Sequence, residues 1–266
     1  MVEPAASWTG DMPQAYARWL VPAVFQPFAV DLARRASAHA PRRVLELAAG
    51  TGVLTRELVV ALPHAEVTAT DLNEDMVQAG RLLVPQAAWQ QTDAMHLPFD
   101  DARYDLVACQ FGVMFLPDKP AAFAEARRVL TPDGTALVNT WDTLDSHDFQ
   151  RALVAALVEV FPDDPPTFMG TVPHGYADVD RVVSDLEAGG MRCVAVDSVT
   201  LEGHAESVAG LAAGYCTGTP LRAEIQARGD LADTTAAVAD RMVSMLGEGP
   251  VVGRMAAHVV EATPAA

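Results

Sequence analysis

The sequence is poor in cysteine and in long apolar runs, and both shortages exclude classes of protein. Its 266 residues include only three cysteines, Cys109, Cys193 and Cys216, which are scattered along the chain. Neither a disulfide framework nor a zinc site is built from such spacing, so we expect a reduced, cytoplasmic compartment and no metal. No apolar run reaches the ~18 residues that a membrane-spanning helix needs, and the first residues lack a signal-peptide pattern.

Basic residues are also scarce. The chain has 18 Lys and Arg against 35 Asp and Glu, which gives a formal net charge of −17. An acidic surface repels nucleic-acid phosphates and anionic lipids, so we expect neither nucleic acid nor a membrane as a partner. The charge can equally be a solubility feature alone. Since 50% of the residues are hydrophobic, the length suits one large α/β domain with insertions.

A short apolar run followed by a small-residue turn is the most informative stretch. Residues 43–52 read RVLELAAGTG, and residues 53–61 have the pattern of a helix. A strand, a tight turn and a helix present backbone N–H groups to a ligand at the helix N-terminus. The third small residue of a dinucleotide fingerprint would fall at Thr55, which disfavours NAD or FAD. No Lys-Ser/Thr pair follows, which excludes a P-loop.

An acid, Glu46, precedes this turn. A carboxylate there would repel a pyrophosphate and suit a cationic ligand such as S-adenosylmethionine, which carries a sulfonium and an ammonium. The stretch resembles the first motif of the class I S-adenosylmethionine-dependent methyltransferases, which is an acid, then small residues, then Gly-x-Gly. Gly50 and Gly52 match the motif, whereas Ala48 replaces its first glycine. The alternative is an ordinary strand–turn–helix corner of another α/β protein.

A second acid follows the next predicted strand, at 66–70. Asp71 lies about 20 residues beyond the glycine turn, where an acid can accept both hydroxyls of a ribose. It can also help to cap the helix that follows, a role that Asn73 can fill instead. With Asp71 on the ribose, Leu72 and Met76 are placed to pack against an adenine ring.

The third and fourth predicted strands, 88–92 and 104–109, extend the resemblance. In the methyltransferases an acid after the third strand accepts the adenine amino group and the next backbone N–H donates to the ring, which implies these roles for Asp93 and Ala94. Asp93 as a plain turn residue is the alternative. The run LPFD at 97–100 followed by YDLV at 104–107 resembles ubiquinone-type and other small-molecule methyltransferases. Gln110, after the fourth strand, could bond the methionine part of the cofactor.

The resemblance implies a Rossmann-like α/β fold. We expect a seven-stranded mixed sheet, mostly parallel with an antiparallel last strand, and helices on both faces. Residues 1–40 would form a helical cover broken at Pro22 and Pro27, and residues 41–262 the methyltransferase domain. Within that domain we expect a turn at 131–134 before the fifth strand, and helical lid insertions at about 142–176 and 203–248, which would carry substrate choice.

The acceptor site and any base are less defined. We expect the substrate pocket at the side chains of Phe111, Met114, Phe115, Trp141, Tyr176 and Tyr215, although core packing explains the apolar ones equally well. By resemblance, Tyr16 could reach the methionine end of the cofactor, or it could simply pack. His147 and His174 are the preferred catalytic bases because they lie in the first insertion, yet most histidines have ordinary structural roles.

These patterns predict a methyltransferase that uses S-adenosylmethionine. It would act on an O, N or C acceptor of a small molecule, a secondary metabolite or a quinone-like aromatic, as a monomer or homodimer. An S-adenosylmethionine-binding protein that does not transfer methyl groups would share the same cofactor motifs. A nicotinamide dehydrogenase is disfavoured by Thr55 and Glu46.

Overall fold

A computed structural model describes residues 10–265 of the chain. The chain forms two compact units. The first contains the chain up to Phe28, Asp142–Gly175 and Thr200–Ala256, and the second contains Ala29–Trp141, Tyr176–Val199 and the chain from Ala257 on. The division expected from the sequence, with a cover at 1–40 and lid insertions, stays a prediction.

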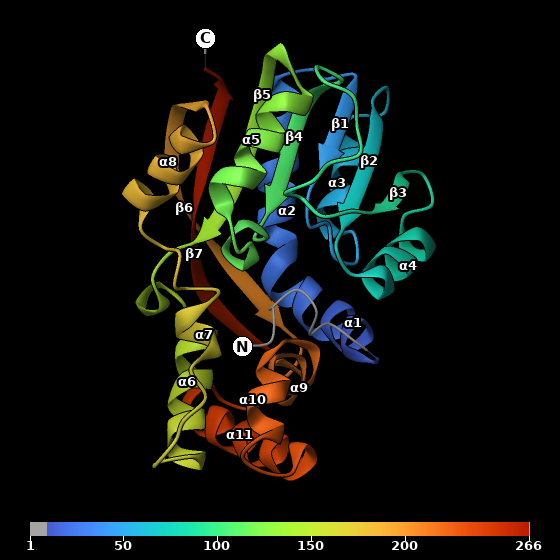
Figure 1. The fold of residues 1–266 in the computed structure, drawn as a ribbon. Coiled ribbons are helices and arrows are strands. Elements are labelled where there is room, and N and C mark those ends of the chain that lie inside the picture. The colour runs from blue at the N-terminus through green and yellow to red at the C-terminus, as the bar shows by residue number, and fades with distance from the viewer. Residues whose placement is uncertain (1–9, 266) are drawn as a thin grey trace. The chain divides into compact units, whose positions relative to one another are not determined.

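The sheet has seven strands in the order β3-β2-β1-β4-β5-β7-β6 (Figure 1). Strands β1 to β5 are parallel neighbours, and β7 runs antiparallel to β5 from Ala136↔Ala262 to Trp141↔Ala257. The fold class predicted from the sequence is therefore confirmed. The strands are β1 (Arg43–Glu46), β2 (Glu66–Asp71), β3 (Ala88–Gln91), β4 (Tyr104–Gln110), β5 (Leu130–Trp141), β6 (Met191–Ala205) and β7 (Val251–Pro264).

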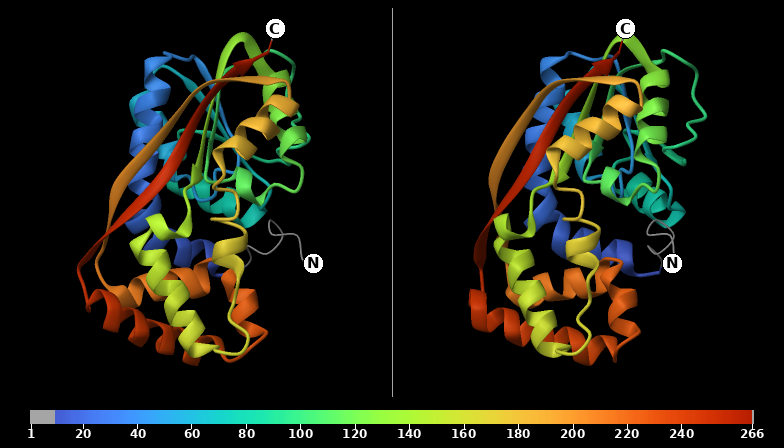
Figure 2. Two further views of the ribbon diagram at one scale, coloured as in Figure 1. Left: turned by 90° about the vertical axis from the view of Figure 1, so that its left-hand side faces the viewer. Right: turned by 60° about the vertical axis from the view of Figure 1, so that its left-hand side comes forward.

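The described helices that belong wholly or mainly to the second unit are α2 (Gln26–Ala38), α3 (Val53–Ala61), α4 (Glu74–Leu83), the short η3 (Val113–Phe115), α5 (Lys119–Val129) and α8 (Val179–Ala188). Capping side chains fix where several begin. The Asn73 Oδ1 atom accepts a bond from the Met76 N–H, and Asp118 accepts one from Ala121. Figures 1 and 2 show α5 and α2 on opposite faces of the sheet, with α8 beside α5. Both faces are thus covered, as a parallel sheet requires.

The core of the second unit lies along the central strands. Val44 and Leu45 of β1 and Leu106 of β4 are fully buried. At the β3 side, the Trp89 ring lies so close to α4 that a Cβ at Gly80 would come within 2.2 Å of it. The Trp89 Nε1 atom also donates to the Val84 carbonyl at 3.0 Å. Buried side chains therefore hold the central strands in place, and the absence of a side chain at Gly80 leaves room for the Trp89 ring.

The described part of the first unit is mainly helical. Its elements are α1 (Met12–Ala15), η2 (Tyr16–Phe25), η4 (Leu144–Ser146), α6 (Asp148–Val160), α7 (Phe168–Thr171), α9 (Val208–Gly218), α10 (Leu221–Gln226) and α11 (Leu231–Leu246). Helix α9 approaches η2 closely through its glycines. A Cβ at Gly214 would lie 2.8 Å from Trp19 and Leu20, and one at Gly218 would lie 2.7 Å from the Tyr16 nitrogen. Larger residues at these positions would separate the two helices.

Two expectations for local structure are wrong. Pro22 and Pro27 do not break the first helix, because it continues from Met12 to Ala38 through a π-helical section at 16–25 that contains Pro22. Pro22 has no N–H to donate, and it lies where the helix widens to the i→i+5 pattern of a π-helix. The turn expected at 131–134 lies within β5 instead, where the register against β4 shifts between Tyr104 and Leu106. An irregular strand start replaces the separate turn.

Among residues 10–265, no helix combines the length and apolar character needed to cross a membrane.

Candidate cofactor site

The turn after β1 is held in an uncommon backbone conformation. Ala48 has φ 52°, Gly50 has φ 56° and Gly52 has φ 90°, all in the left-handed region. The Ala49 N–H donates to the Thr70 carbonyl at 2.9 Å, which ties the turn to β2. A Cβ at Gly50 would meet nothing within 4 Å, so the turn borders open space there. The sequence motif thus forms a cradle with room for a ligand beside its backbone.

Ala48 is the residue of this turn that departs from the motif, and it adopts a conformation that costs alanine about 1–2 kcal/mol. Replacing Ala48 with glycine should therefore raise the free energy of unfolding, by about 0.5–1 kcal/mol once the extra freedom of glycine in the unfolded chain is subtracted. Urea denaturation measures this. The control is Ala79→Gly within α4, which should lower stability by about 1 kcal/mol. Destabilisation by both variants would show that the methyl group of Ala48 is needed for packing.

Asp71 connects this turn to the start of α4. Its Oδ2 atom accepts the Gly50 N–H at 2.8 Å, and its Oδ1 atom accepts the Asn73 N–H at 2.9 Å. Burial raises the pKa of the carboxyl, and the backbone N–H donors oppose that rise. Each carboxylate oxygen can accept a further bond, so the oriented carboxylate has capacity left for two ribose hydroxyls. Asn73, and not Asp71, caps α4, so Asp71 does not have to serve as the helix cap.

Glu46 lies at the carboxyl end of β1 and is fully enclosed. The Thr55 hydroxyl donates to its Oε2 atom at 2.6 Å. Burial, mainly, raises the pKa of Glu46 to about 8, with a further rise from the nearby Asp71 charge. Sequence reasoning used Thr55 only to disfavour a dinucleotide site and missed this hydrogen bond. A buried carboxyl with a pKa near 8 binds a proton at neutral pH and gains charge readily when a cation arrives.

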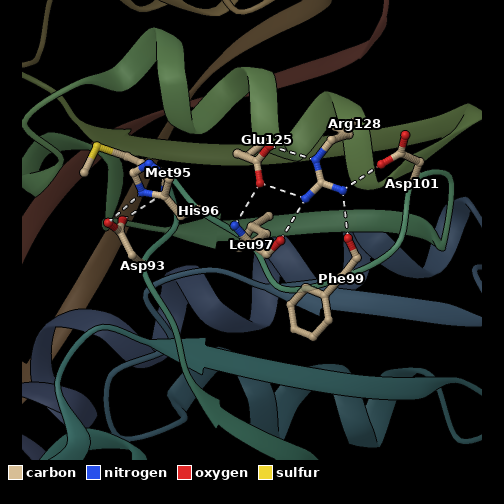
Figure 3. A network of polar contacts seen from close by, with 8 residues as sticks. All are labelled: Asp93, Met95, His96, Leu97, Phe99, Asp101, Glu125 and Arg128. Atoms are coloured by element: carbon tan, nitrogen blue, oxygen red, sulfur yellow. Dashed lines mark hydrogen bonds and ion pairs between the residues drawn. The ribbon is translucent and has the colours of Figure 1, made fainter.

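The segment after β3 carries the predicted adenine ligands. The Asp93 Oδ1 atom accepts the Met95 N–H at 2.9 Å, and its Oδ2 atom lies 3.2 Å from the His96 Nδ1 atom (Figure 3). Ala94 is buried, whereas Leu72 at the end of β2 has 43% of its surface exposed. Since β2 and β3 are parallel, their ends lie at one edge of the sheet, which places an exposed apolar side chain near an acid.

Phe111 follows β4 at the same edge in a left-handed conformation, with φ 51°. Its N–H donates to the Asn139 Oδ1 atom at 2.9 Å and approaches the Asn139 carbonyl at 3.2 Å. The ring stacks on Trp141, with centroids 3.4 Å apart and planes 7° apart. A phenylalanine held at positive φ stores about 1–3 kcal/mol, and such strain clusters at functional sites.

The remaining predicted residues of the second unit are Gln110, Met76, Met114, Phe115 and Tyr176. The first three are buried, and Phe115 is half-buried. Tyr176 is buried too, and its hydroxyl donates to the Asp185 Oδ2 atom of α8 at 2.8 Å. Burial, first, and that carboxylate raise the pKa of the phenol. This hydroxyl is therefore bound within the protein.

Tyr16, His147, His174 and Tyr215 belong to the first unit. Tyr16 packs on Phe25 with ring centroids 4.9 Å apart, and Tyr215 is buried. The rings of His147 and His174 meet edge to face at 4.5 Å, and the His174 Nδ1 atom lies 2.8 Å from the Asp142 carbonyl oxygen. The structure thus brings the two predicted bases together, and burial lowers the pKa of both.

This buried pair should make the fold sensitive to acid. The pKa of His147 is lowered to about 3 from 6.5, mainly by burial. The unfolded chain therefore takes up protons as the pH falls below 6.5 while the folded chain does not, so stability falls with pH, by about 2 kcal/mol at pH 5. His147→Phe should flatten the dependence of Tm on pH between 6.5 and 5, whereas the exposed His64→Gln should leave it unchanged. An unaltered slope in His147→Phe would contradict the assignment.

Comparison with known proteins gives the family. Residues 44–134 match a family model described as a methyltransferase domain. The chain is 39% identical over 170 residues to the ubiquinone/menaquinone biosynthesis C-methyltransferase UbiE of Burkholderia cenocepacia, covering 57% of this chain and 68% of that protein. It is 38% identical over 106 residues to the demethylmenaquinone methyltransferase of Deinococcus radiodurans. The chain spans only 44% of that second protein, and 52% of the UbiE protein of Dinoroseobacter shibae.

Solved structures share the fold. The YcgJ protein of Bacillus subtilis superposes with a TM-score of 0.57 at 17% identity, covering 90% of this chain and 99% of that one. The [4+2]-cyclase SpnF superposes with a TM-score of 0.57 at 16% identity, covering 90% and 81%.

The cofactor of this family, S-adenosylmethionine, fits the residues present. Gly50 borders open space, Asp71 keeps acceptor capacity beside it, and the buried acid Glu46, which favours a cation, lies close enough to Asp71 to feel its charge. From the length and identity of the match to the Burkholderia cenocepacia protein, together with the seven-stranded sheet, the chain belongs to the class I S-adenosylmethionine-dependent methyltransferases.

Proposed function

We propose that this chain binds S-adenosylmethionine at the carboxyl edge of β1 to β4 and transfers its methyl group to an O, N or C atom of a small molecule. The observation that carries the proposal is the Asp71 carboxylate, which is oriented by the Gly50 and Asn73 N–H groups beside the open turn. The names of two relatives, a ubiquinone/menaquinone biosynthesis C-methyltransferase and a demethylmenaquinone methyltransferase, support an aromatic acceptor.

The chain's residues would bind and orient the reactants. Asp71 would accept the ribose hydroxyls, Asp93 the adenine amino group, and the Ala94 N–H would donate to the ring. Gln110 would bond the methionine part. Leu72 and Met76 would pack on the adenine. When bound, the cofactor supplies a methyl group on a positively charged sulfur, and holding the acceptor in line with that bond while excluding water is the main protein contribution.

Glu46 would assist through charge. In the free protein its carboxyl is mostly neutral at neutral pH, because its pKa is about 8. A bound sulfonium or ammonium would favour the ionised form, so that cofactor binding and proton release from Glu46 are linked.

For the acceptor, we propose a pocket in the second unit that includes Phe111, Met114, Phe115 and Trp141, with Tyr176 contributing from another segment of the same unit. The rings of Phe111 and Trp141 are buried and stack on each other, and flat apolar rings of this kind would suit packing against a quinone-like aromatic. The inserted segments 142–176 and 203–248 would set substrate choice. His147 with a pKa near 3 is a weak base, so we expect acceptors that need little help in losing a proton.

The test is turnover with S-adenosylmethionine that carries a 13C,2H-labelled methyl group. The panel of acceptors should include reduced demethylmenaquinone and simpler phenols, and mass spectrometry should find S-adenosylhomocysteine and labelled acceptor in equal amounts. His147→Phe and His174→Phe should keep cofactor affinity, and turnover falls in them only if one is the base. Native size measurement would distinguish the two expected states, monomer and homodimer, and fractionation of cells tests the expected cytoplasmic location.

A second function is an S-adenosylmethionine-binding protein that catalyses another reaction or none. The same fold is found in a [4+2]-cyclase, so the fold alone does not require methyl transfer. Tight S-adenosylhomocysteine binding without labelled product from any acceptor would favour this alternative.

A further inference from the structure

Arg128, near the end of α5, uses all of its side-chain N–H groups on neighbouring residues (Figure 3). The Nε and Nη2 atoms form a fork on the Glu125 carboxylate, each at 2.7 Å. The Nη1 atom donates to the Phe99 carbonyl and to Asp101, both at 2.7 Å, and Nη2 donates to the Leu97 carbonyl at 2.8 Å. Such a forked, charge-assisted pair fixes both direction and distance.

The same end of α5 makes further hydrogen bonds with the backbone of the loop at 97–103. The Glu125 Oε2 atom accepts the Leu97 N–H at 2.8 Å. The Ala102 N–H donates to the Arg128 carbonyl at 2.9 Å, and the Arg103 N–H donates to the Val129 carbonyl at 2.8 Å. The Arg128 hydrogen bond is the main cause that lowers the pKa of Glu125, so the pair stays ionised at neutral pH. The loop is therefore fastened to α5 along its whole length.

This fastening ends where the predicted adenine turn begins. Asp93 and His96 close a short turn, in which the His96 N–H donates to the Asp93 carbonyl at 3.0 Å and the Met95 N–H to its side chain. On the other side, the Thr92 N–H donates to the Asp71 carbonyl at 2.9 Å. The turn at 93–96 thus lies between two fixed points. On one side Thr92 is hydrogen-bonded to Asp71 of β2, and on the other Leu97 is hydrogen-bonded to Glu125 and Arg128. Within the turn, Ala94 is buried and His96 is exposed.

We infer that Arg128, with Glu125, is a positioning residue that holds the Asp93 turn in the geometry needed to recognise the adenine amino group. Arg128 itself touches no ligand in this account. Its effect is pre-organisation: without the fork, the turn samples more conformations, and adenine binding must select one of them. The inference rests on the proposed adenine role of Asp93.

The experiment measures binding of two ligands to the full chain by calorimetry. One is S-adenosylhomocysteine, and the other is its purine analogue, which lacks the 6-amino group and keeps the ring nitrogen N1. Arg128→Gln should weaken S-adenosylhomocysteine roughly tenfold and the analogue much less. Arg127→Gln is the matched control: it removes the same charge one residue earlier, where the side chain donates to the Ala265 carbonyl at 3.3 Å rather than to the loop at 97–103, and it should change neither affinity.

Asp93→Ala separates failure of the inference from failure of the proposed function. It should weaken S-adenosylhomocysteine selectively, and adding Arg128→Gln to it should then cost little more. If Asp93→Ala shows no selectivity between the two ligands, the adenine assignment fails, and the inference with it. If Asp93→Ala is selective but Arg128→Gln weakens both ligands equally, or costs as much in the Asp93→Ala background, only the inference is overturned.

Arg128→Lys provides a second variant in case Arg128→Gln does not fold. Lysine keeps the charge but cannot form the fork, so it should fold and show a smaller loss with the same ligand selectivity. Hydrogen exchange of the free protein should show faster exchange at 93–97 in both Arg128 variants and not in Arg127→Gln. Unchanged exchange at 93–97 would overturn the inference independently of any ligand.

Discussion

Replacing Asp71 with asparagine should lower the affinity for S-adenosylhomocysteine by about 10- to 150-fold, equivalent to about 1.5–3 kcal/mol for lost charge-assisted bonds. The carboxylate accepts the Gly50 and Asn73 N–H groups and, in our proposal, both ribose hydroxyls. Asparagine offers one oxygen, and its amide would direct N–H toward a donor. Calorimetric titration of both proteins at one pH measures the difference.

Asp75→Asn is the matched control for this experiment. Asp75 is exposed in the first turn of α4, so its replacement removes the same charge from the same region without touching the turn. We expect its affinity to equal that of the unaltered protein. Equal affinities for all three proteins would remove Asp71 from the ribose site.

Replacing Glu46 with glutamine should stabilise the protein and weaken its binding of S-adenosylmethionine. The folded pKa of about 8 lies above the usual value of 4.5. As the pH rises from 4.5 to 8, the unfolded chain ionises while the folded chain keeps its proton, so stability is progressively lost. Above pH 8 the loss is complete. Glutamine never ionises, so at pH 8 the variant should be more stable by about 2–4 kcal/mol.

The binding effect should depend on ligand charge. Glu46→Gln should weaken S-adenosylmethionine more than S-adenosylhomocysteine, because only the former has a positively charged sulfur. The control is Glu66→Gln, at an exposed position that begins the neighbouring strand, with no expected change in either property. A Glu46→Gln variant of ordinary stability and unaltered ligand preference would show that this acid has neither role. The expected outcome, by contrast, is a site retained for function at the expense of stability.

The fold could be predicted from the sequence because its signals are local. The apolar runs before Glu46 and Asp71 define β1 and β2, and the helix predicted at 53–61 is α3 as observed. The predictions failed where the folded structure overrides a local sequence preference. Pro22 lies inside a helix because a π turn accommodates it, and the turn at 131–134 is absorbed by the pairing of β5 with β4.

The site was predictable only in part, for a similar reason. Asp71 and Gly50 stand near each other because a motif with fixed spacing joins consecutive elements. The Thr55–Glu46 hydrogen bond also joins neighbouring elements. The raised pKa of Glu46, however, comes mainly from burial, which cannot be read from the sequence. Two further features could not be predicted because no sequence spacing signals them. Arg128 binds carbonyls about 30 residues away along the chain, and Phe111 stacks on Trp141 only once the chain has folded.

The most direct test of the account is a crystal structure of the chain with S-adenosylhomocysteine bound. We expect the ribose hydroxyls within hydrogen-bonding distance of the Asp71 carboxylate, the adenine amino group on Asp93, and the sulfur facing the end of β4 near Phe111. A nucleoside bound elsewhere on the chain, or bound at this edge with its ribose away from Asp71, would contradict it.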